Sequence, residues 1–141
     1  MALNWCHSLK ADIKNIAIRD QLKLCRQTVF IEWGGWDHRA ELLNTQATML
    51  GILDGALYAF QNSLETLGLQ DDVITFSCSD FGGTLCSNGQ GTDHAWAGNQ
   101  LCFGGPVAGG HVHGTFPSLV IDGVDDVGQG GRLFPKLSCD E

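Results

Sequence analysis

Apolar side chains recur along residues 45–67 at spacings of one, three and four, which is the pattern of an amphipathic helix. They are Met49, Leu50, Leu53, Leu57, Phe60, Leu64 and Leu67. Gly68 follows directly, at the position where a glycine commonly ends a helix. The pattern predicts one long helix over residues 45–67, and a similar but weaker pattern predicts a second helix over residues 9–24.

Two short runs have the composition of buried strands. Residues 28–33 (TVFIEW) and 72–77 (DVITFS) are rich in β-branched and aromatic side chains. A strand, a long helix and a second strand form a βαβ unit, whose strands are parallel and whose crossover is right-handed. The sequence therefore predicts an α/β fold with a mainly parallel sheet.

The second half of the chain has a different composition. Residues 82–114 are dense in glycine, which predicts tight turns and close backbone approach rather than long regular elements. Within and after this stretch, residues 100–103 and 118–121 are candidates for short strands. From Asp122 onward the chain is acidic and glycine-rich, and a loop is expected.

Composition narrows the classes of partner. The chain has 141 residues, a net charge of -8 and only 8 Lys and Arg, which argues against nucleic acid and against an anionic membrane surface. No apolar run approaches membrane-spanning length, and the N-terminus lacks the blocks of a secretory signal. As written, the chain is expected to be cytoplasmic. Cys78 and Cys102 lie in apolar runs and are expected to be buried.

Candidate chemistry follows the two predicted strands. Asp37 and Asp80 come after them, at the carboxyl ends where α/β sheets bind ligands, and His94 lies in the glycine-rich region. Carboxylates with an imidazole suit zinc, manganese or iron better than calcium. The alternative is that both aspartates cap loops or helix starts. His38 adjoins Asp37, and the two side chains need not face the same way.

Other polar groups carry weaker signals. His111 and His113 lie two residues apart and either bind a metal or decorate a surface strand. The run Asp122, Asp125, Asp126 resembles a calcium loop only loosely, and a solvated loop is the simpler interpretation. Ser79 and Thr84 are possible nucleophiles, but no histidine-based triad can be assigned, so the catalytic residues stay unknown.

Several motifs resemble one bacterial family in the same order. They are GGWDHR, the helix beginning NTQATML, SDFGGTL, NGQGTDHAWAGNQ and GGPVAGGHVHG, spread over about residues 27–133. This is the domain-of-unknown-function family fifteen-oh-one, placed in the alkaline phosphatase and sulfatase superfamily. The resemblance implies a three-layer α/β/α sandwich and puts Asp37, Asp80 and His94 at metal-ligand positions.

The chain departs from the family pattern at two positions. The first motif commonly ends in a histidine where Arg39 stands here, so one expected ligand is missing, and His38 is the possible substitute. The second motif commonly reads SDFGRT, and Gly83 here replaces its arginine. Family members are also much longer and usually carry an export signal, which implies periplasmic full-length relatives. Residues 1–141 are therefore expected to form a single partial domain, the C-terminal portion of a longer one.

Two functions follow as expectations. The first is a truncated member of a metal-dependent phosphatase or sulfatase-like hydrolase superfamily, weakly active or inactive alone, with zinc or manganese as its metal. If active, it would hydrolyse phosphoric or sulfuric esters. The second is a non-catalytic structural or interaction module that keeps the fold. In both cases a partial sheet implies self-association or pairing with a missing N-terminal portion.

Overall fold

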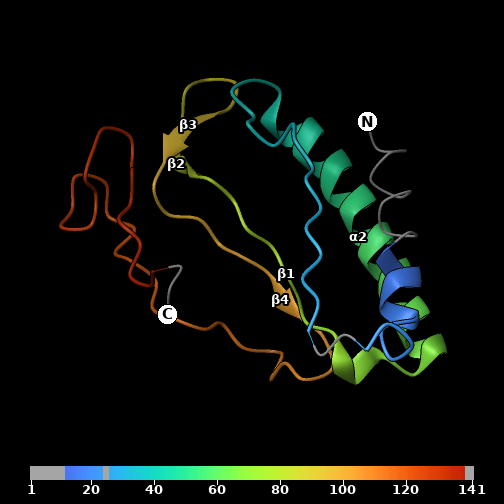
Figure 1. Cartoon of the computed structure of the whole chain (residues 1–141). Coiled ribbons are helices and arrows are strands. Elements are labelled where there is room, and N and C mark those ends of the chain that lie inside the picture. Colours follow the sequence, from blue (N-terminus) through green and yellow to red (C-terminus); the bar gives the residue numbers. More distant parts are fainter. Residues whose placement is uncertain (1–11, 24–25, 139–141) are drawn as a thin grey trace. The chain divides into compact units, whose positions relative to one another are not determined.

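The longest element is helix α2 (Leu42–Leu67), which confirms the helix expected from the apolar periodicity (Figure 1). It ends at Gly68, whose φ of 68° lies in the left-handed region. The N–H of Gly68 donates to the carbonyl of Glu65 at 3.0 Å, and the N–H of Leu69 donates to that of Leu64 at 2.9 Å. These two bonds form a Schellman motif, so the glycine ends the helix as expected.

The computed structural model describes residues 12–23 and 26–138, and these fall into two units. The first unit holds the described residues up to Asp37, together with residues 46–74 and 104–106. The second unit holds residues 38–45, 75–103 and the described residues from Val107 onward. Each unit has its own contacts and is described by itself.

The core of the first unit lies on the C-terminal half of α2. Leu64 is 1% exposed and Phe60 is 7% exposed, and both pack with Ile16 from a helical segment at residues 12–17. Figure 1 shows that this short helix lies against the lower half of α2. It is shorter than the predicted helix over residues 9–24, of which residues 9–11 and 24 lie outside the described residues.

A short turn of helix closes this core. After α2 the chain forms the 3₁₀ helix η1 (Gln70–Asp72), and Leu69 and Val73 on either side pack against the buried cluster. The guanidinium of Arg19 donates to the carboxylate of Asp72 at 2.5 Å, and this hydrogen bond raises the pKa of Arg19. The pair ties the end of the N-terminal segment to the turn after α2.

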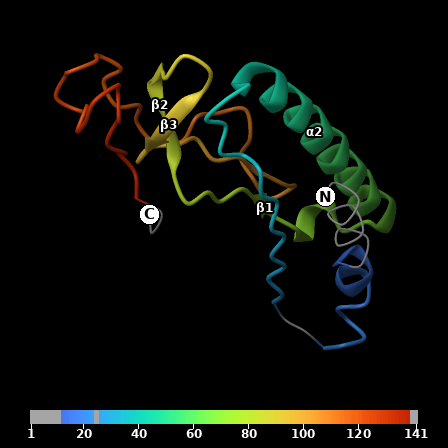
Figure 2. The same ribbon diagram turned by 90° about the horizontal axis from the view of Figure 1, so that it is seen from above.

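The second unit contains two antiparallel strand pairs. Strand β1 (Thr75–Phe76) pairs with β4 (Cys102–Phe103), with Thr75 opposite Phe103. Strands β2 (Gly82–Ser87) and β3 (Thr92–Ala95) form a hairpin, with Gly83 opposite His94 (Figure 2). Beyond the hairpin, the N–H groups of Leu85 and Cys86 donate to the carbonyls of Gly131 and Gly130.

The predicted parallel sheet, and with it the alkaline-phosphatase-like partial sandwich, is wrong. Among the described residues the strands form two separate antiparallel pairs, and residues 28–33 are not assigned to any strand. The second predicted strand is reduced to β1, which pairs with β4 from a later part of the chain. The hairpin β2–β3 joins neighbours in sequence, so its closure costs less chain entropy than a parallel crossover does.

Of the expectations for short strands and buried cysteines in the second half of the chain, one is partly confirmed and the others are wrong. Part of the strand expected at residues 100–103 is present as β4, but residues 118–121 are not in a strand. The hairpin β2–β3 is an element that the sequence patterns do not predict, because the glycine density there favours turns over regular structure. Cys78 and Cys102 are exposed free thiols, so the expectation that they are buried is wrong.

Candidate functional site

A four-residue loop turns the chain between β2 and β3 and so places His94. The side-chain oxygen of Asn88 accepts the N–H groups of Gln90 at 3.1 Å and Gly91 at 2.8 Å. Gly89 supplies a φ of 106°, which favours glycine. Asn-Gly is the strongest short-range signal of a hairpin, and it is present in the sequence as a clue to this element.

The segment that carries His38 and Arg39 lies directly against this loop. The N–H of Thr92 donates to the carbonyl of His38 at 3.2 Å, and the side-chain amide of Asn88 donates to the carbonyl of Arg39 at 3.2 Å. A Cβ on Gly91 would lie 2.1 Å from the carbonyl oxygen of His38. The absence of a side chain at position 91 therefore permits this close approach.

His94 is held by two neighbours from different parts of the second unit. Its ring stacks on Phe81, with centroids 3.9 Å apart and ring planes at 29°. The guanidinium Nη2 of Arg39 lies 2.8 Å from Nε2 of His94 and 3.4 Å from its Nδ1. The sequence patterns do not single out Phe81 as a site residue, although it is the residue next to Asp80.

The contact with Arg39 decides what His94 can do. A guanidinium only donates hydrogen bonds, so the closer ring nitrogen, Nε2, acts as the acceptor and its lone pair is occupied. A metal ligand needs that same lone pair, and a divalent cation there would also lie beside a permanent positive charge. With Arg39 in this position, the groups around His94 do not fit a divalent metal ion.

The four predicted metal ligands divide between the units. Asp37 belongs to the first unit and is exposed, whereas His38, Asp80 and His94 belong to the second unit. Within the second unit His38 is buried, and Asp80 is exposed on a bend just before Phe81 and β2. The described residues contain no group of three or more His, Cys, Asp or Glu side chains that could hold a metal. That Asp37, Asp80 and His94 share one ion, with His38 as the substitute for the missing ligand, stays a prediction.

The acidic run near the C-terminus organises its own loop. Asp125 accepts the N–H of Ser118 at 2.7 Å and pairs with the ammonium of Lys136. Asp126 accepts the N–H groups of Asp122, Gly128 and Arg132 at 2.9, 3.2 and 3.0 Å.

The pKa values of both carboxyls reflect these donors. The Lys136 ammonium and then the Ser118 N–H lower the pKa of Asp125, and main-chain N–H groups, led by that of Asp122, lower the pKa of Asp126. These carboxylate oxygens accept bonds from the chain itself, which favours the simpler interpretation of the run as a loop over a calcium site. Arg132 also joins this loop to the hairpin, because its Nε donates to the carbonyl of His94 at 3.1 Å.

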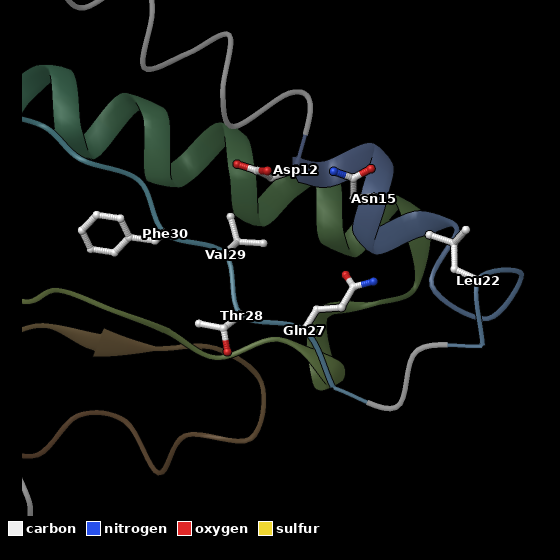
Figure 3. Close-up of a pocket in the computed structure, with 7 residues that line it drawn as sticks. All are labelled: Asp12, Asn15, Leu22, Gln27, Thr28, Val29 and Phe30. Atoms are coloured by element: carbon white, nitrogen blue, oxygen red, sulfur yellow. The ribbon is translucent and has the colours of Figure 1, made fainter.

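A separate hollow lies in the first unit. It has a volume of about 470 Å³ and is lined by Asp12, Asn15, Leu22, Gln27, Thr28, Val29 and Phe30 (Figure 3). Its lining mixes polar and apolar side chains, and none of them belongs to the predicted metal site.

Comparison with known protein families gives a match over most of the chain. A family model described as "Protein of unknown function (DUF1501)" matches residues 21–133, which is most of the chain. No curated protein and no solved structure matches. In the part of the chain that the structure describes, no helix is both long enough and apolar enough to cross a membrane.

Proposed function

Since the chain belongs to the family of proteins of unknown function DUF1501, we propose that it is a hydrolase-like protein of the alkaline phosphatase and sulfatase superfamily. Its own hydrolysis of phosphate or sulfate esters is weak or absent. The superfamily assignment rests on the order of the motifs around Asp37, Asp80 and His94. The weak activity rests on a single observation, the 2.8 Å contact between Arg39 and His94.

Arg39 and a metal ion compete for the same nitrogen lone pair of His94. Arg39 stands where the family pattern has a histidine, so the chain loses one neutral ligand and gains a cation. That cation then occupies Nε2 of the histidine that remains. Both effects weaken metal binding, because imidazole binds metals only through a free nitrogen and like charges repel.

The test is the variant Arg39→His, studied by titration calorimetry with zinc and with manganese. The wild-type chain should bind these ions weakly or not at all, and the variant should bind at least about tenfold more tightly because it restores an imidazole ligand. Arg39→Ala is the matched control, since it removes the competing cation without adding a ligand. The double variant Arg39→His, His94→Ala should lose the gain.

Hydrolysis is measured on the same proteins with p-nitrophenyl phosphate and p-nitrophenyl sulfate. A rise in ester hydrolysis with added zinc or manganese in Arg39→His, absent from the wild type, supports the hydrolase-like assignment. Equal metal affinities of the wild type and Arg39→His would contradict the role given to position 39.

A second candidate function is a non-catalytic interaction module. The observation that favours it is the number of large apolar side chains exposed in the described residues, including Phe30 at 83%, Trp96 at 68% and Val124 at 93%. Exposed apolar surface on this scale is typical of proteins that bind a partner. If Arg39→His gains metal affinity but no ester hydrolysis, this second function is favoured.

A further inference from the structure

Residues 26–33 have the burial pattern of a strand, although none of the strands that the structure describes includes them. Gln27, Ile31 and Trp33 are partly buried, whereas the alternate positions Arg26, Thr28, Phe30 and Glu32 are exposed. Val29 is the one position out of step, at 40% exposed. A period of two is the signature of extended chain with one covered face and one free face.

The main chain of residues 28–32 has no hydrogen-bond partner among the described residues. Extended backbone with β-branched and aromatic side chains and free main-chain groups is a template for pairing with another strand.

The hollow in the first unit lies between residues 27–30 and the short helix at residues 12–17, so this helix does not cover the extended segment there. Its walls are Asp12, Asn15 and Leu22 on one side and residues 27–30 on the other (Figure 3). Phe30, 83% exposed, lies on the wall formed by the extended segment. The segment is therefore accessible to another chain along this stretch.

We propose that a second copy of this chain pairs with residues 26–32 as an antiparallel strand, with Val29 opposite Val29 of the second copy. This pairing does not depend on the hydrolase-like function. It would satisfy about six main-chain hydrogen bonds, two for each of three directly bonded residue pairs. It would also place Thr28 beside Phe30 of the second copy.

Charge complementarity selects this register. With Val29 at the centre, Arg26 of each copy lies opposite Glu32 of the other, so two ion pairs form across the interface on the exposed face. Moving the centre by one residue to Phe30 places Glu32 opposite Thr28 and Arg26 opposite Gly34, and both ion pairs are lost. Opposite charges facing each other across strands stabilise pairing, and like charges oppose it.

The test exchanges these charges one at a time. Arg26→Glu carries two acidic groups on this face and Glu32→Arg carries two basic groups, so each variant should repel its own copies. Each should dimerise roughly tenfold more weakly than the wild type, because two attractive pairs become repulsive. An equimolar mixture of the two variants should dimerise again, since every Glu then faces an Arg. The double variant Arg26→Glu, Glu32→Arg should dimerise as the wild type does.

Sedimentation velocity over a concentration series gives these affinities. The samples are kept reduced because Cys78, Cys86 and Cys102 are exposed thiols that would otherwise link copies covalently. Helix content from circular dichroism confirms that each variant is folded. Restored association in the mixture supports the proposal and excludes misfolding as the cause of the single-variant loss.

Three results of the sedimentation experiments would overturn the proposal. They are a wild-type chain that stays monomeric at 100 µM, single variants that dimerise as tightly as the wild type, and a mixture that fails to associate. Amide exchange gives an independent measure, because residues 27, 29 and 31 should become more protected as the protein concentration rises. Unchanged exchange there would place any dimer contact elsewhere and would likewise overturn it.

Discussion

The C-terminal half of α2 and the hairpin β2–β3 are stabilised by different means. The helix buries Phe60 and Leu64 against Ile16, and its end is fixed by the two hydrogen bonds at Gly68 and Leu69. The hairpin has only Thr84 and Ala95 buried on its strands. It is stabilised instead by hydrogen bonds to the Asn88 side chain, by hydrogen bonds to the main chain of residues 130–133, and by close backbone contacts at glycine residues.

The packing of α2 follows from a repeated pattern of apolar residues, whereas the contacts of the hairpin depend on single residues at particular positions. Along α2, Phe60 and Leu64 are buried and Met49, Leu53 and Leu57 are partly buried, so a change at one of them removes a part of the total burial. The hairpin depends on a few close approaches, and one added methyl group can be incompatible with them. Substitutions in the two regions should therefore differ in how their effects depend on position.

Gly82→Ala should have the largest effect in either region. A Cβ at position 82 would lie 1.7 Å from the carbonyl oxygen of Ala97, so the backbone must move apart. We expect a loss of about 4 kcal/mol or more in the local stability of the hairpin, measured by native-state amide exchange over residues 82–97.

Gly98→Ala is the matched control in the same region. Its Cβ would lie 3.7 Å from the nearest atom, an ordinary contact, and the change should cost less than about 1 kcal/mol. Similar losses for both variants would show that the hairpin is not limited by close backbone approach.

Leu64→Ala should have the next largest effect, about 3 kcal/mol, because it removes a fully buried leucine from the small core of the first unit. The measurement is chemical denaturation followed by the helical signal of α2 in circular dichroism. Leu67→Ala, at a side chain that is 46% exposed on the same helix, serves as the control and should cost less than about 1 kcal/mol. Equal losses would mean that the core is not centred on Leu64.

The sequence predicted the helix and its end because their signals are local and repeated. Seven apolar positions and Gly68 agreed on one element, so no long-range contact was needed to find it. The sheet was predicted wrongly because strand composition in residues 28–33 says that a strand is possible but not what pairs with it. Pairing is decided by contacts between distant residues, such as Thr75 with Phe103.

The candidate site was predictable only in part, for a similar reason. The sequence identified His94 and the unusual residue at position 39, but not that Arg39 contacts His94 across 55 positions of sequence. The stacking of Phe81 on His94 also depends on the register of the hairpin. The Asn-Gly pair at residues 88–89 was the local signal for that hairpin, and glycine density around it concealed the signal.

Asn88→Ala should have a smaller effect and tests whether the loop or the strands hold the hairpin. The side-chain oxygen accepts two main-chain N–H groups of the loop, and the side-chain amide donates to the carbonyl of Arg39. Their loss should cost about 1 kcal/mol, because water replaces part of each bond at this exposed position. The measurement is again amide exchange over residues 82–97.

Asn99→Ala, at another exposed asparagine of the second unit, is the control and should change the exchange rates little. A loss above about 3 kcal/mol for Asn88→Ala would give the loop, and not the glycine contacts, the leading part in holding the hairpin.

The smallest expected effect is a local response to acid in the loop that Asp125 and Asp126 organise. The Lys136 ammonium and the Ser118 N–H lower the pKa of Asp125 in the folded state, and main-chain N–H groups lower the pKa of Asp126. A lowered pKa means that the stabilisation is fully present above the unfolded-state pKa of about 3.9 and is lost as the pH falls through the lower folded-state pKa. Below about pH 4 the amides of Ser118 and Arg132 should therefore exchange faster, while those in the core of α2 should not.

Asp125→Asn should produce that faster exchange at Ser118 already at pH 7, since the amide cannot form the ion pair with Lys136. The control Asp54→Asn changes an exposed carboxyl on α2 and should leave Ser118 unaffected. Carboxyl carbon chemical shifts measured against pH would follow the two aspartates directly. A pKa at or above about 3.9 for both carboxyls would mean that their hydrogen bonds do not stabilise the folded second unit. The stability of this unit would then rest on the backbone contacts of its glycines.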